Sequence, residues 1–186
     1  MLVVLSGPSG AGKSYAVDVL ERDMGAKRVV PWTTRTPRVG ERPGVDYHFR
    51  TTQELASISR SETVGYWAYP LGASTLFGYT NDIDVAALAL ELHVAQAATS
   101  IALSLRSQHA TRVLTVFMDF ATPAAFEERL LRRIASTDER TRRRALAESE
   151  RLRAPDFEAH VVGDNPAESV DTVRRRVSNW LSAGQK

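Results

Sequence analysis

The chain contains no cysteine, which excludes a disulfide framework and a metal site built from thiolates. No apolar run approaches the ~20 residues that a membrane-spanning helix needs. Lysine occurs only at Lys13, Lys27 and Lys186, and the other strongly basic residues are arginines. The net charge of +2 is too small to indicate nucleic-acid binding. We therefore expect one cytoplasmic globular domain over residues 1–186, with neither nucleic acid nor membrane as a partner.

A glycine-rich motif follows the first apolar residues of the chain. Residues 1–5 (MLVVL) predict one buried strand. Residues 7–14 (GPSGAGKS) fit the pattern G-x-x-x-x-G-K-[ST] at every fixed position. Apolar side chains resume between residues 16 and 20 with the spacing of one helix face. This strand–loop–helix context indicates a phosphate-binding loop (P-loop) rather than an ordinary glycine-rich turn.

The residue types of the P-loop predict an ATP site. Its backbone N–H groups and the amino end of the following helix attract phosphate oxygens. We expect Lys13 to reach the β- and γ-phosphates of ATP as a catalytic residue, and the Ser14 hydroxyl to ligate Mg²⁺. The predicted ATP-binding residues are Gly7, Pro8, Ser9, Gly10, Ala11, Gly12, Lys13, Ser14 and Tyr15.

A second informative segment, residues 33–49, is rich in proline and glycine. Arg35 and Arg38 lie three residues apart in it, and two guanidinium groups beside a P-loop suit a second phosphate. Glu41 could hold one of these arginines, and Tyr47 could donate its hydroxyl to the same phosphate oxygens. Taken alone, these residues suit a solvated basic loop equally well.

Together the two motifs resemble those of the guanylate kinase family. The segment T-T-R-T-P-R-x-G-E-x-x-G-x-D-Y-H-F follows G-P-S-G-x-G-K-S, and the similarity is strong over residues 1–52. The order of elements stays similar up to the C-terminus. The resemblance implies that Arg35, Arg38, Glu41 and Tyr47 bind the phosphate of an acceptor. Tyr79 joins them, because residues 76–79 (LFGY) are similar to a Tyr-Tyr-Gly-Ser stretch of the family.

The expected fold is α/β, a P-loop NTPase three-layer sandwich with a parallel sheet and helices on both faces. The resemblance adds two inserts to a core of residues 1–32, 81–132 and 145–186: an acceptor-binding subdomain at 33–80 and a lid at 133–144. Strands are expected at residues 26–32, 63–69, 90–95, 112–118 and 159–163. Helices are expected at residues 13–23, 52–59, 81–89, 97–107, 123–134 and 166–181. A capping box, Thr51-x-x-Glu54, opens the helix at 52–59.

Arginines are concentrated in residues 129–144. Read alone, this segment is either a basic patch for nucleic-acid or membrane phosphates, or a mixed solvated surface, since acidic residues flank it. The resemblance implies that it contains the lid, whose arginines close over the transferred phosphoryl group. Arg133 and Arg144 fall on the catalytic positions of that lid.

The positions that read guanine in the family differ in this chain. Guanine carries donors at N1 and N2 and an acceptor at O6, so its site needs carboxylates and hydroxyl-type donors. The aligned positions hold Pro31-Trp32, Gly65 or Tyr66, Tyr79, and His93 or Val94. This predicts a different or smaller group beyond the phosphate, in a pocket formed by Trp32, Glu91 and His93. In the alternative, a shifted alignment lets Glu62 or Glu91 supply the carboxylate, and His93 is an ordinary strand residue.

The sequence therefore predicts an ATP-dependent kinase that transfers the γ-phosphoryl group to a small phosphate monoester, with Mg²⁺ as cofactor. A nucleoside monophosphate (GMP, dGMP or a related nucleotide) is the leading acceptor. One alternative is a non-guanine acceptor, as in ribose 1,5-bisphosphate kinase, a relative of guanylate kinases. The other is a binding module without activity, but such modules typically lose the P-loop, which here retains Lys13 and Ser14. The oligomeric state stays open.

Overall fold

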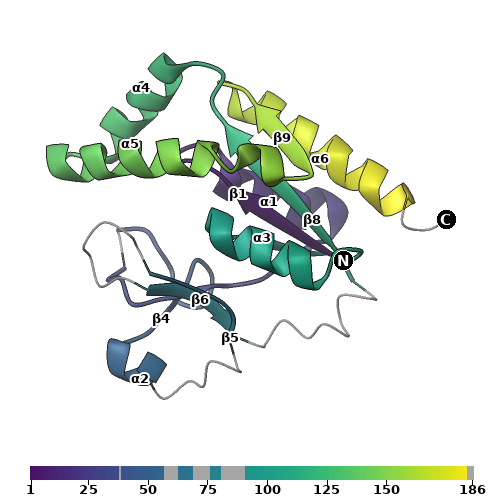
Figure 1. Ribbon diagram of the computed structural model, residues 1–186, viewed down its shortest axis with the longest axis horizontal. Helices are drawn as coiled ribbons and strands as arrows, with labels where there is room; N and C mark the ends of the chain where they lie inside the picture. Colours follow the sequence, from purple (N-terminus) through teal and green to yellow (C-terminus); the bar gives the residue numbers. More distant parts are fainter. Residues whose placement is uncertain (38, 57–62, 69–75, 81–90, 184–186) are drawn as a thin grey trace.

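The computed structural model describes residues 1–37, 39–56, 63–68, 76–80 and 91–183, of which 55–56, 63–68 and 76–80 are described by their backbone alone. Figure 1 shows a main sheet, a smaller second sheet and the helices around them. The main sheet has five strands in the order β2-β7-β1-β8-β9, and every neighbouring pair is parallel. Its strands are β1 (Leu2–Ser6), β2 (Lys27–Arg28), β7 (His93–Gln96), β8 (Val113–Asp119) and β9 (Ala159–Val162).

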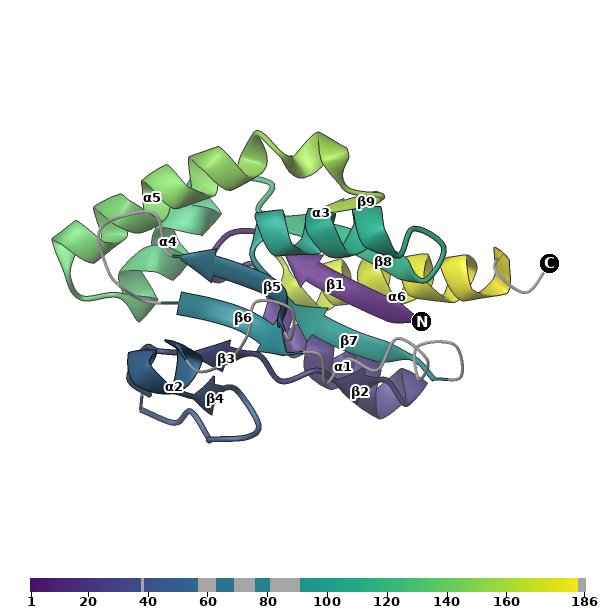
Figure 2. The ribbon, with the colours of Figure 1, turned by 60° about the horizontal axis from the view of Figure 1, so that its bottom comes forward.

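Helices cover both faces of the main sheet, as its apolar central strands require. Both β1 and β8 are buried along their whole length. Val3 and Leu5 of β1 pack with helices α1 and α6, whereas Leu2 and Val4 pack with α3 on the other face. Figure 2 shows α3 on one side of the main sheet and α1 and α6 on the other. None of the described helices is long and apolar enough to cross a bilayer. The longer helices are α1 (Lys13–Met24), α3 (Thr99–Gln108), α4 (Pro123–Arg133), α5 (Thr137–Arg151) and α6 (Pro166–Ala183).

The second sheet is small and mixed, with the strand order β4-β3-β6-β5. Its β3 strand pairs in parallel with β4 and antiparallel with β6, which also pairs antiparallel with β5. Figures 1 and 2 show this sheet and the α4–α5 pair on opposite sides of the end of the main sheet toward which β1 points. The elements of this part are β3 (Trp32–Thr33), β4 (His48–Phe49), α2 (Thr52–Ala56), β5 (Thr63–Ala68) and β6 (Leu76–Thr80).

The capping box predicted at the start of α2 is confirmed. The backbone N–H of Thr51 donates to the Glu54 carboxylate at 2.6 Å, and the N–H of Glu54 donates to the Thr51 hydroxyl at 3.1 Å. Two backbone donors at the helix start are thereby satisfied by side chains. These bonds also depress the pKa of Glu54 below its usual value.

The structure confirms the α/β class, with a parallel sheet between helical layers. The single strand predicted at residues 26–32 is wrong, because this segment is divided between the two sheets. The Val29 N–H still donates to Val94 at 2.8 Å, but Pro31 has no N–H to continue the ladder, and β3 begins at Trp32. The strand predicted at 90–95 begins only at His93. The helix predicted at 81–89 lies outside the described residues.

Candidate active site

The P-loop lies between β1 and α1, and its glycines have backbone conformations that other residues rarely adopt. Gly7 has a φ of 126°, and a Cβ atom built on it would lie 2.0 Å from the Met118 carbonyl oxygen of β8. Gly12 has a φ of 91° and forms the amino-terminal cap of α1. The loop is therefore pressed against the core with no room for a side chain at Gly7, and its backbone conformation is fixed by that packing.

Lys13 is the first residue of α1 and its ammonium group is held by the loop itself. The Nζ atom donates to the Gly7 carbonyl at 2.6 Å and to the Pro8 carbonyl at 2.8 Å. Burial lowers the pKa of Lys13 to about 8, against the attraction of Glu150 and with the repulsion of Arg133 and Arg143. A partly buried cation at the mouth of a glycine loop is suited to binding an anion such as a phosphate chain.

A cavity of about 990 Å³ opens over the P-loop, and helices α4 and α5 form its basic wall. This volume is ample for a nucleotide-sized ligand. Arg133, the last residue of α4 and a catalytic position by the family resemblance, lies in this wall. The arginines of the described residues that line the wall on these two helices are Arg129, Arg132, Arg133 and Arg143.

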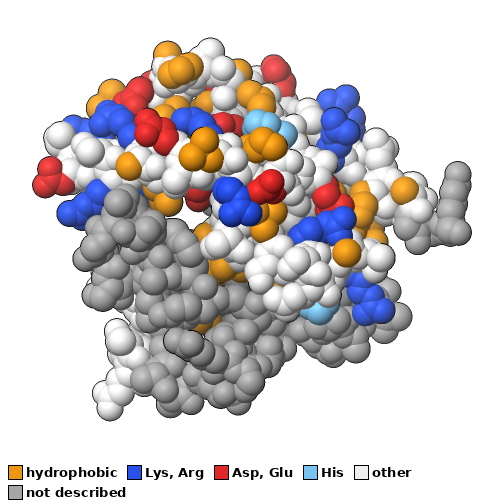
Figure 3. All heavy atoms as spheres, in the orientation of Figure 1, with side chains coloured by type: hydrophobic (Ala, Val, Ile, Leu, Met, Phe, Trp, Pro, Cys, Tyr) orange, Lys and Arg blue, Asp and Glu red, His pale blue; other side chains and the backbone are white. Residues whose placement is uncertain are grey.

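Carboxylates form ion pairs with some of the arginines in this wall and so reduce its positive charge. Arg132 pairs with Glu128 at 2.7 Å, and Arg143 pairs with Glu139 at 2.8 Å. Figure 3 accordingly shows blue and red side chains mixed over the α4 and α5 face. Of the two readings of the arginine-rich segment, this arrangement favours the mixed surface over a continuous basic patch for nucleic acid.

Glu150 of α5 lines the same cavity and was not singled out by the sequence. Burial raises the pKa of its carboxyl to about 7, although Lys13 and Arg143 favour the charged form. A nearby carboxylate, Asp119 of β8, adds repulsion, while itself accepting bonds of 2.8 and 2.9 Å from Arg151. Nothing in the sequence distinguishes Glu150 from the other acidic residues of this segment, because its position depends on where α5 crosses the P-loop.

The loop before β4 holds a second arginine site on the other side of the cavity. The two terminal nitrogens of Arg35 donate to the Glu41 carboxylate at 2.9 and 2.7 Å. The Arg35 guanidinium also lies over the Tyr47 ring, 5.3 Å from its centre. Glu41 and Tyr47 line the cavity, together with Asp46 and Pro31, whereas Arg35 lies behind them and does not line it. Of the other predicted members, Arg38 and the Tyr79 side chain lie outside the described atoms.

Many kinds of P-loop protein could have this geometry, and comparison with known proteins shows to which family this chain belongs. The family model for guanylate kinase matches residues 1–180. The chain belongs to the guanylate kinase family. It is therefore a phosphotransferase of the nucleoside monophosphate kinase type, and the family implies ATP as co-substrate together with Mg²⁺. The intact Lys13 and Ser14 agree with this activity and not with the alternative of a non-catalytic module.

Individual relatives extend over nearly the whole chain. The guanylate kinase of Dechloromonas aromatica is 32% identical over 195 residues, covering 98% of this chain and 91% of its own. That of Chlorobaculum tepidum is 29% identical over 191 residues, covering 97% and 93%. The crystal structure of guanylate kinase from Anaplasma phagocytophilum has a TM-score of 0.69 and 23% identity, covering 100% of this chain and 86% of its own. Shikimate kinase from Bacteroides thetaiotaomicron, with a TM-score of 0.52 and 14% identity, shares the fold.

Two residues predicted for the acceptor pocket of this guanylate kinase family member lie at the wrong end of β7. His93 pairs with Leu2 at the amino end of β1, whereas the P-loop follows the carboxyl end of that strand. Glu91 precedes β7 and pairs with Lys27 at 2.7 Å. Neither side chain lines the cavity. The prediction is wrong because the hydrophobic pattern places a strand in the sequence but does not show which end of the strand borders the cavity.

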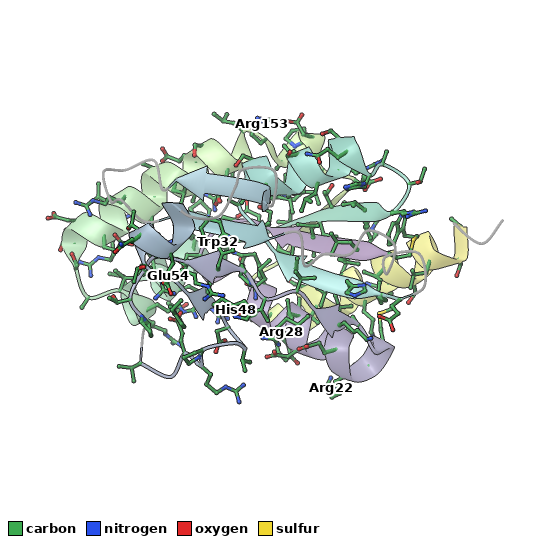
Figure 4. All side chains as sticks on the ribbon, turned by 90° about the horizontal axis from the view of Figure 1, so that it is seen from below. Arg22, Arg28, Trp32, His48, Glu54 and Arg153 are labelled. Carbon is green, nitrogen blue, oxygen red and sulfur yellow. The ribbon has the colours of Figure 1, made fainter. Side chains whose placement is uncertain are left out.

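Trp32 is also misplaced by the sequence prediction. The tryptophan belongs to β3, is 3% exposed, and does not line the cavity, where the preceding Pro31 lies instead. Figure 4 shows Trp32 within the small sheet, away from Arg28. Its ring is therefore buried within the small sheet and is absent from the described lining of the cavity.

Arg144, which the resemblance placed among the catalytic arginines of the lid, does not point into the cavity. Its guanidinium donates to the Glu127 carboxylate of α4 at 2.7 and 2.6 Å, and it does not line the cavity. The pair depresses the pKa of Glu127. The cavity-facing residue is the preceding Arg143. One residue corresponds to a turn of about 100° around a helix, so a one-residue error in alignment moves a side chain off the face that contacts the ligand.

The residues around Ser14 suit a magnesium ion that arrives with the nucleotide. The Ser14 hydroxyl is a hard oxygen ligand beside the loop that binds phosphates. Gln96 at the end of β7 lies 3.5 Å from it by its amide oxygen. No group of three histidine, cysteine or acidic side chains that could form a metal cage occurs within the described parts of the chain. These features fit Mg²⁺, which is usually held through substrate phosphates and few protein ligands.

Proposed function

We propose that this protein transfers the γ-phosphoryl group of MgATP to the phosphate of a nucleoside monophosphate, with GMP or dGMP as the leading acceptor. The observation that supports the proposal is that the P-loop and the Arg35-bearing loop border one cavity from opposite sides. Lys13 lines it on the donor side, and Glu41 and Tyr47, which hold Arg35, line it on the acceptor side. The family supports the same class of acceptor.

The chemistry requires charge stabilisation and alignment more than bond-making groups. Both reactants are anions, so the attacking phosphate oxygen needs no general base. Lys13 and the loop N–H groups hold the donor phosphates, and Arg133 and Arg143 stabilise the charge on the phosphoryl group in transfer. Ser14 would hold the Mg²⁺ ion that enters with ATP, and that ion would supply positive charge against the phosphates.

The acceptor-binding insert at 33–80 and the lid at 133–144 complete the proposed mechanism. Arg35 binds the acceptor phosphate, with Arg38 and Tyr79 as further proposed partners. The proposed lid covers the end of α4, the connection to α5 and the first half of α5. Closing of both parts over the cavity brings donor and acceptor oxygens into line and excludes water, which prevents hydrolysis of ATP.

A second candidate acceptor is a phosphate ester without guanine, such as ribose 1,5-bisphosphate. Recognition of guanine N1 and N2 calls for carboxylates. The strand β7 ends instead at the neutral Gln96, which Ala97 and Ala98 follow. Of the described carboxylates on that side, Glu41 binds Arg35 and Asp46 accepts the Arg42 N–H at 2.8 Å. With neutral residues after β7 and both described carboxylates engaged, the site supports an acceptor that needs fewer carboxylate contacts than guanine does.

A panel of acceptors under identical MgATP tests both candidates. The purified protein is incubated with GMP, dGMP, AMP, CMP, UMP and ribose phosphates, and ADP release and acceptor phosphorylation are measured, with Lys13→Ala as the inactive control. Transfer to GMP and dGMP above all others supports the leading proposal, and transfer to a ribose phosphate above the nucleotides supports the second. ATP hydrolysis without transfer to any of these acceptors contradicts both.

A further inference from the structure

Gln96 and Ser14 come from different elements but meet at the same edge of the main sheet. Gln96 is the last residue of β7, and its backbone is paired with Leu5 of β1, directly before the P-loop. The next residue, Ala97, donates its N–H to the Leu5 carbonyl at 3.0 Å. A buried contact of 3.2 Å between the Ser6 and Thr99 hydroxyls fastens the chain beyond it. The backbone that carries the Gln96 side chain is therefore fixed relative to the P-loop.

The Gln96 carboxamide faces the hydroxyl that the family motif assigns to Mg²⁺. The Ser14 oxygen lies 3.5 Å from Oε1 and 3.4 Å from Nε2 of Gln96. Among the described residues, no other side chain lies within hydrogen-bonding distance of that hydroxyl. Neighbouring oxygen ligands of an octahedral Mg²⁺ are about 3 Å apart, since each lies about 2 Å from the ion. Small side-chain rotations therefore allow both groups to contact one ion or one of its waters.

Among the described residues, the aspartate at the end of β8 is engaged elsewhere and does not assist Ser14. P-loop enzymes commonly hold Mg²⁺ with the serine or threonine and an aspartate at a strand end. Asp119 at the end of β8 accepts two bonds from Arg151 and one of 2.8 Å from the Phe120 N–H, and it does not line the cavity. Glu139 lines the cavity but binds Arg143. Within the described part of the chain, the strand-end side chain in contact with the Ser14 hydroxyl is thus the amide of Gln96.

We infer that Gln96 supplies a neutral second contact for the Mg²⁺ ion of bound MgATP, positioning the ion beside Ser14. This inference rests on the proposed function, since it concerns the ion that enters with the donor. A neutral amide leaves the positive charge of the ion available to the phosphates, whereas a carboxylate cancels part of it. The protein itself therefore holds Mg²⁺ weakly, and the ion binds together with the nucleotide.

The test measures nucleotide affinity with and without the metal, separately from catalysis. The dissociation constants of ADP are determined by calorimetry in Mg²⁺ and in EDTA, for the unchanged protein, Gln96→Ala and Gln96→Glu. The control is Gln108→Ala, an exposed glutamine of α3 bonded to Ser104. Gln96→Ala is expected to reduce the gain in affinity from Mg²⁺ by about tenfold and to leave the metal-free value unchanged. Gln96→Glu is expected to weaken metal-free binding and to increase that gain.

Each outcome has a defined meaning. A gain from Mg²⁺ that is the same in Gln96→Ala as in Gln108→Ala overturns the inference and leaves the proposed function standing. Gln96→Glu is nearly isosteric, so it supplies the answer if the alanine variant does not fold: an unchanged gain in this variant also overturns the inference. Failure of the unchanged protein to bind ADP in either condition overturns the proposed function together with the inference.

Discussion

The proposed donor and acceptor sides of the cavity are built differently, one from backbone and the other from side chains. On the donor side the backbone forms the cradle, and Gly7 packs so closely on Met118 that a Cβ atom would lie 2.0 Å from its carbonyl oxygen. On the acceptor side, side chains form the site: Arg35 is held by Glu41 and Tyr47. Gly44 of that loop also has a positive φ, 76°, but nothing lies within 4 Å of a Cβ built on it.

This contrast explains how each half tolerates change. Substitutions that change a backbone site fixed by core packing also destabilise the fold, because the geometry of the site and the stability of the fold depend on the same contacts. A side-chain site on a surface loop can be altered residue by residue. We expect substitutions in the donor half to be poorly tolerated. Substitutions in the acceptor half are expected to allow a different substrate to bind. The following predictions test this contrast.

The largest expected effect is that of Gly7→Ala. The overlap with the Met118 backbone and the φ of 126° are expected to lower the free energy of unfolding by more than about 3 kcal/mol. Gly44→Ala, which also has a positive φ but open space around it, is expected to cost only about 1 kcal/mol. Urea denaturation of both variants measures the two values. Equal losses contradict the difference between the two halves.

Lys13→Ala is expected to lower kcat by about 10²–10³-fold, because a charge contact in a dry site is lost from the transition state. The free energy of unfolding is expected not to fall, since burial opposes the Lys13 charge, as its lowered pKa indicates. Lys27→Ala serves as the matched control, because Lys27 is an exposed lysine paired with Glu91 at the other end of the sheet. Steady-state kinetics and thermal unfolding measure both effects. Full activity in a folded Lys13→Ala protein contradicts the donor site.

Arg35→Lys is expected to raise the KM for the acceptor by roughly tenfold or more and to leave the KM for ATP nearly unchanged. An ammonium cannot reproduce the forked contact that Arg35 makes with Glu41, nor its stacking on Tyr47. Arg42→Lys, an exposed position of the same loop, is the control and is expected to change neither KM. Steady-state kinetics with each substrate varied in turn distinguish these outcomes, and an equal rise in both KM values contradicts the assignment.

Glu150→Gln is expected to raise the free energy of unfolding at pH 8 by about 1–3 kcal/mol and to change it little near pH 4.5. Burial raises the folded-state pKa of Glu150 to about 7, above the unfolded value, so the folded form holds a proton that the unfolded form has lost. Stability therefore falls as the pH rises between about 4.5 and 7, and the neutral glutamine removes that fall. Denaturation at several pH values measures it, with the exposed Glu148→Gln as control. A variant that is less stable at pH 8 contradicts the buried carboxylate.

Sequence reasoning succeeded where residue types fix backbone geometry. The P-loop and the Thr51–Glu54 capping box require particular residues at fixed spacing, so both were predictable before the fold was known. Helices α1, α3 and α6 and the central strands β1 and β8 were predictable for a related reason, since their apolar periodicity reflects the two faces of one sheet. Helix α5 was not predicted, because Ala147 is its one buried residue and it has no apolar face to detect.

It failed where the outcome depends on how elements meet in space. Gln96, not Glu91 or His93, faces the P-loop, because the parallel register with β1 selects the carboxyl end of β7. Arg143 lines the cavity in place of Arg144, because the packing of α5 on α4 decides which of its faces points into the cavity. Such choices follow from long-range contacts, which no local pattern encodes.

The most direct test of the account is a pair of binding titrations on two variants. Lys13→Ala and Arg35→Ala are each titrated by calorimetry with a non-hydrolysable MgATP analogue and with the best acceptor of the panel. We expect Lys13→Ala to lose affinity for the ATP analogue alone, and Arg35→Ala to lose affinity for the acceptor alone. A loss of MgATP-analogue affinity in Arg35→Ala as large as that in Lys13→Ala would contradict the division of one cavity into a donor side and an acceptor side.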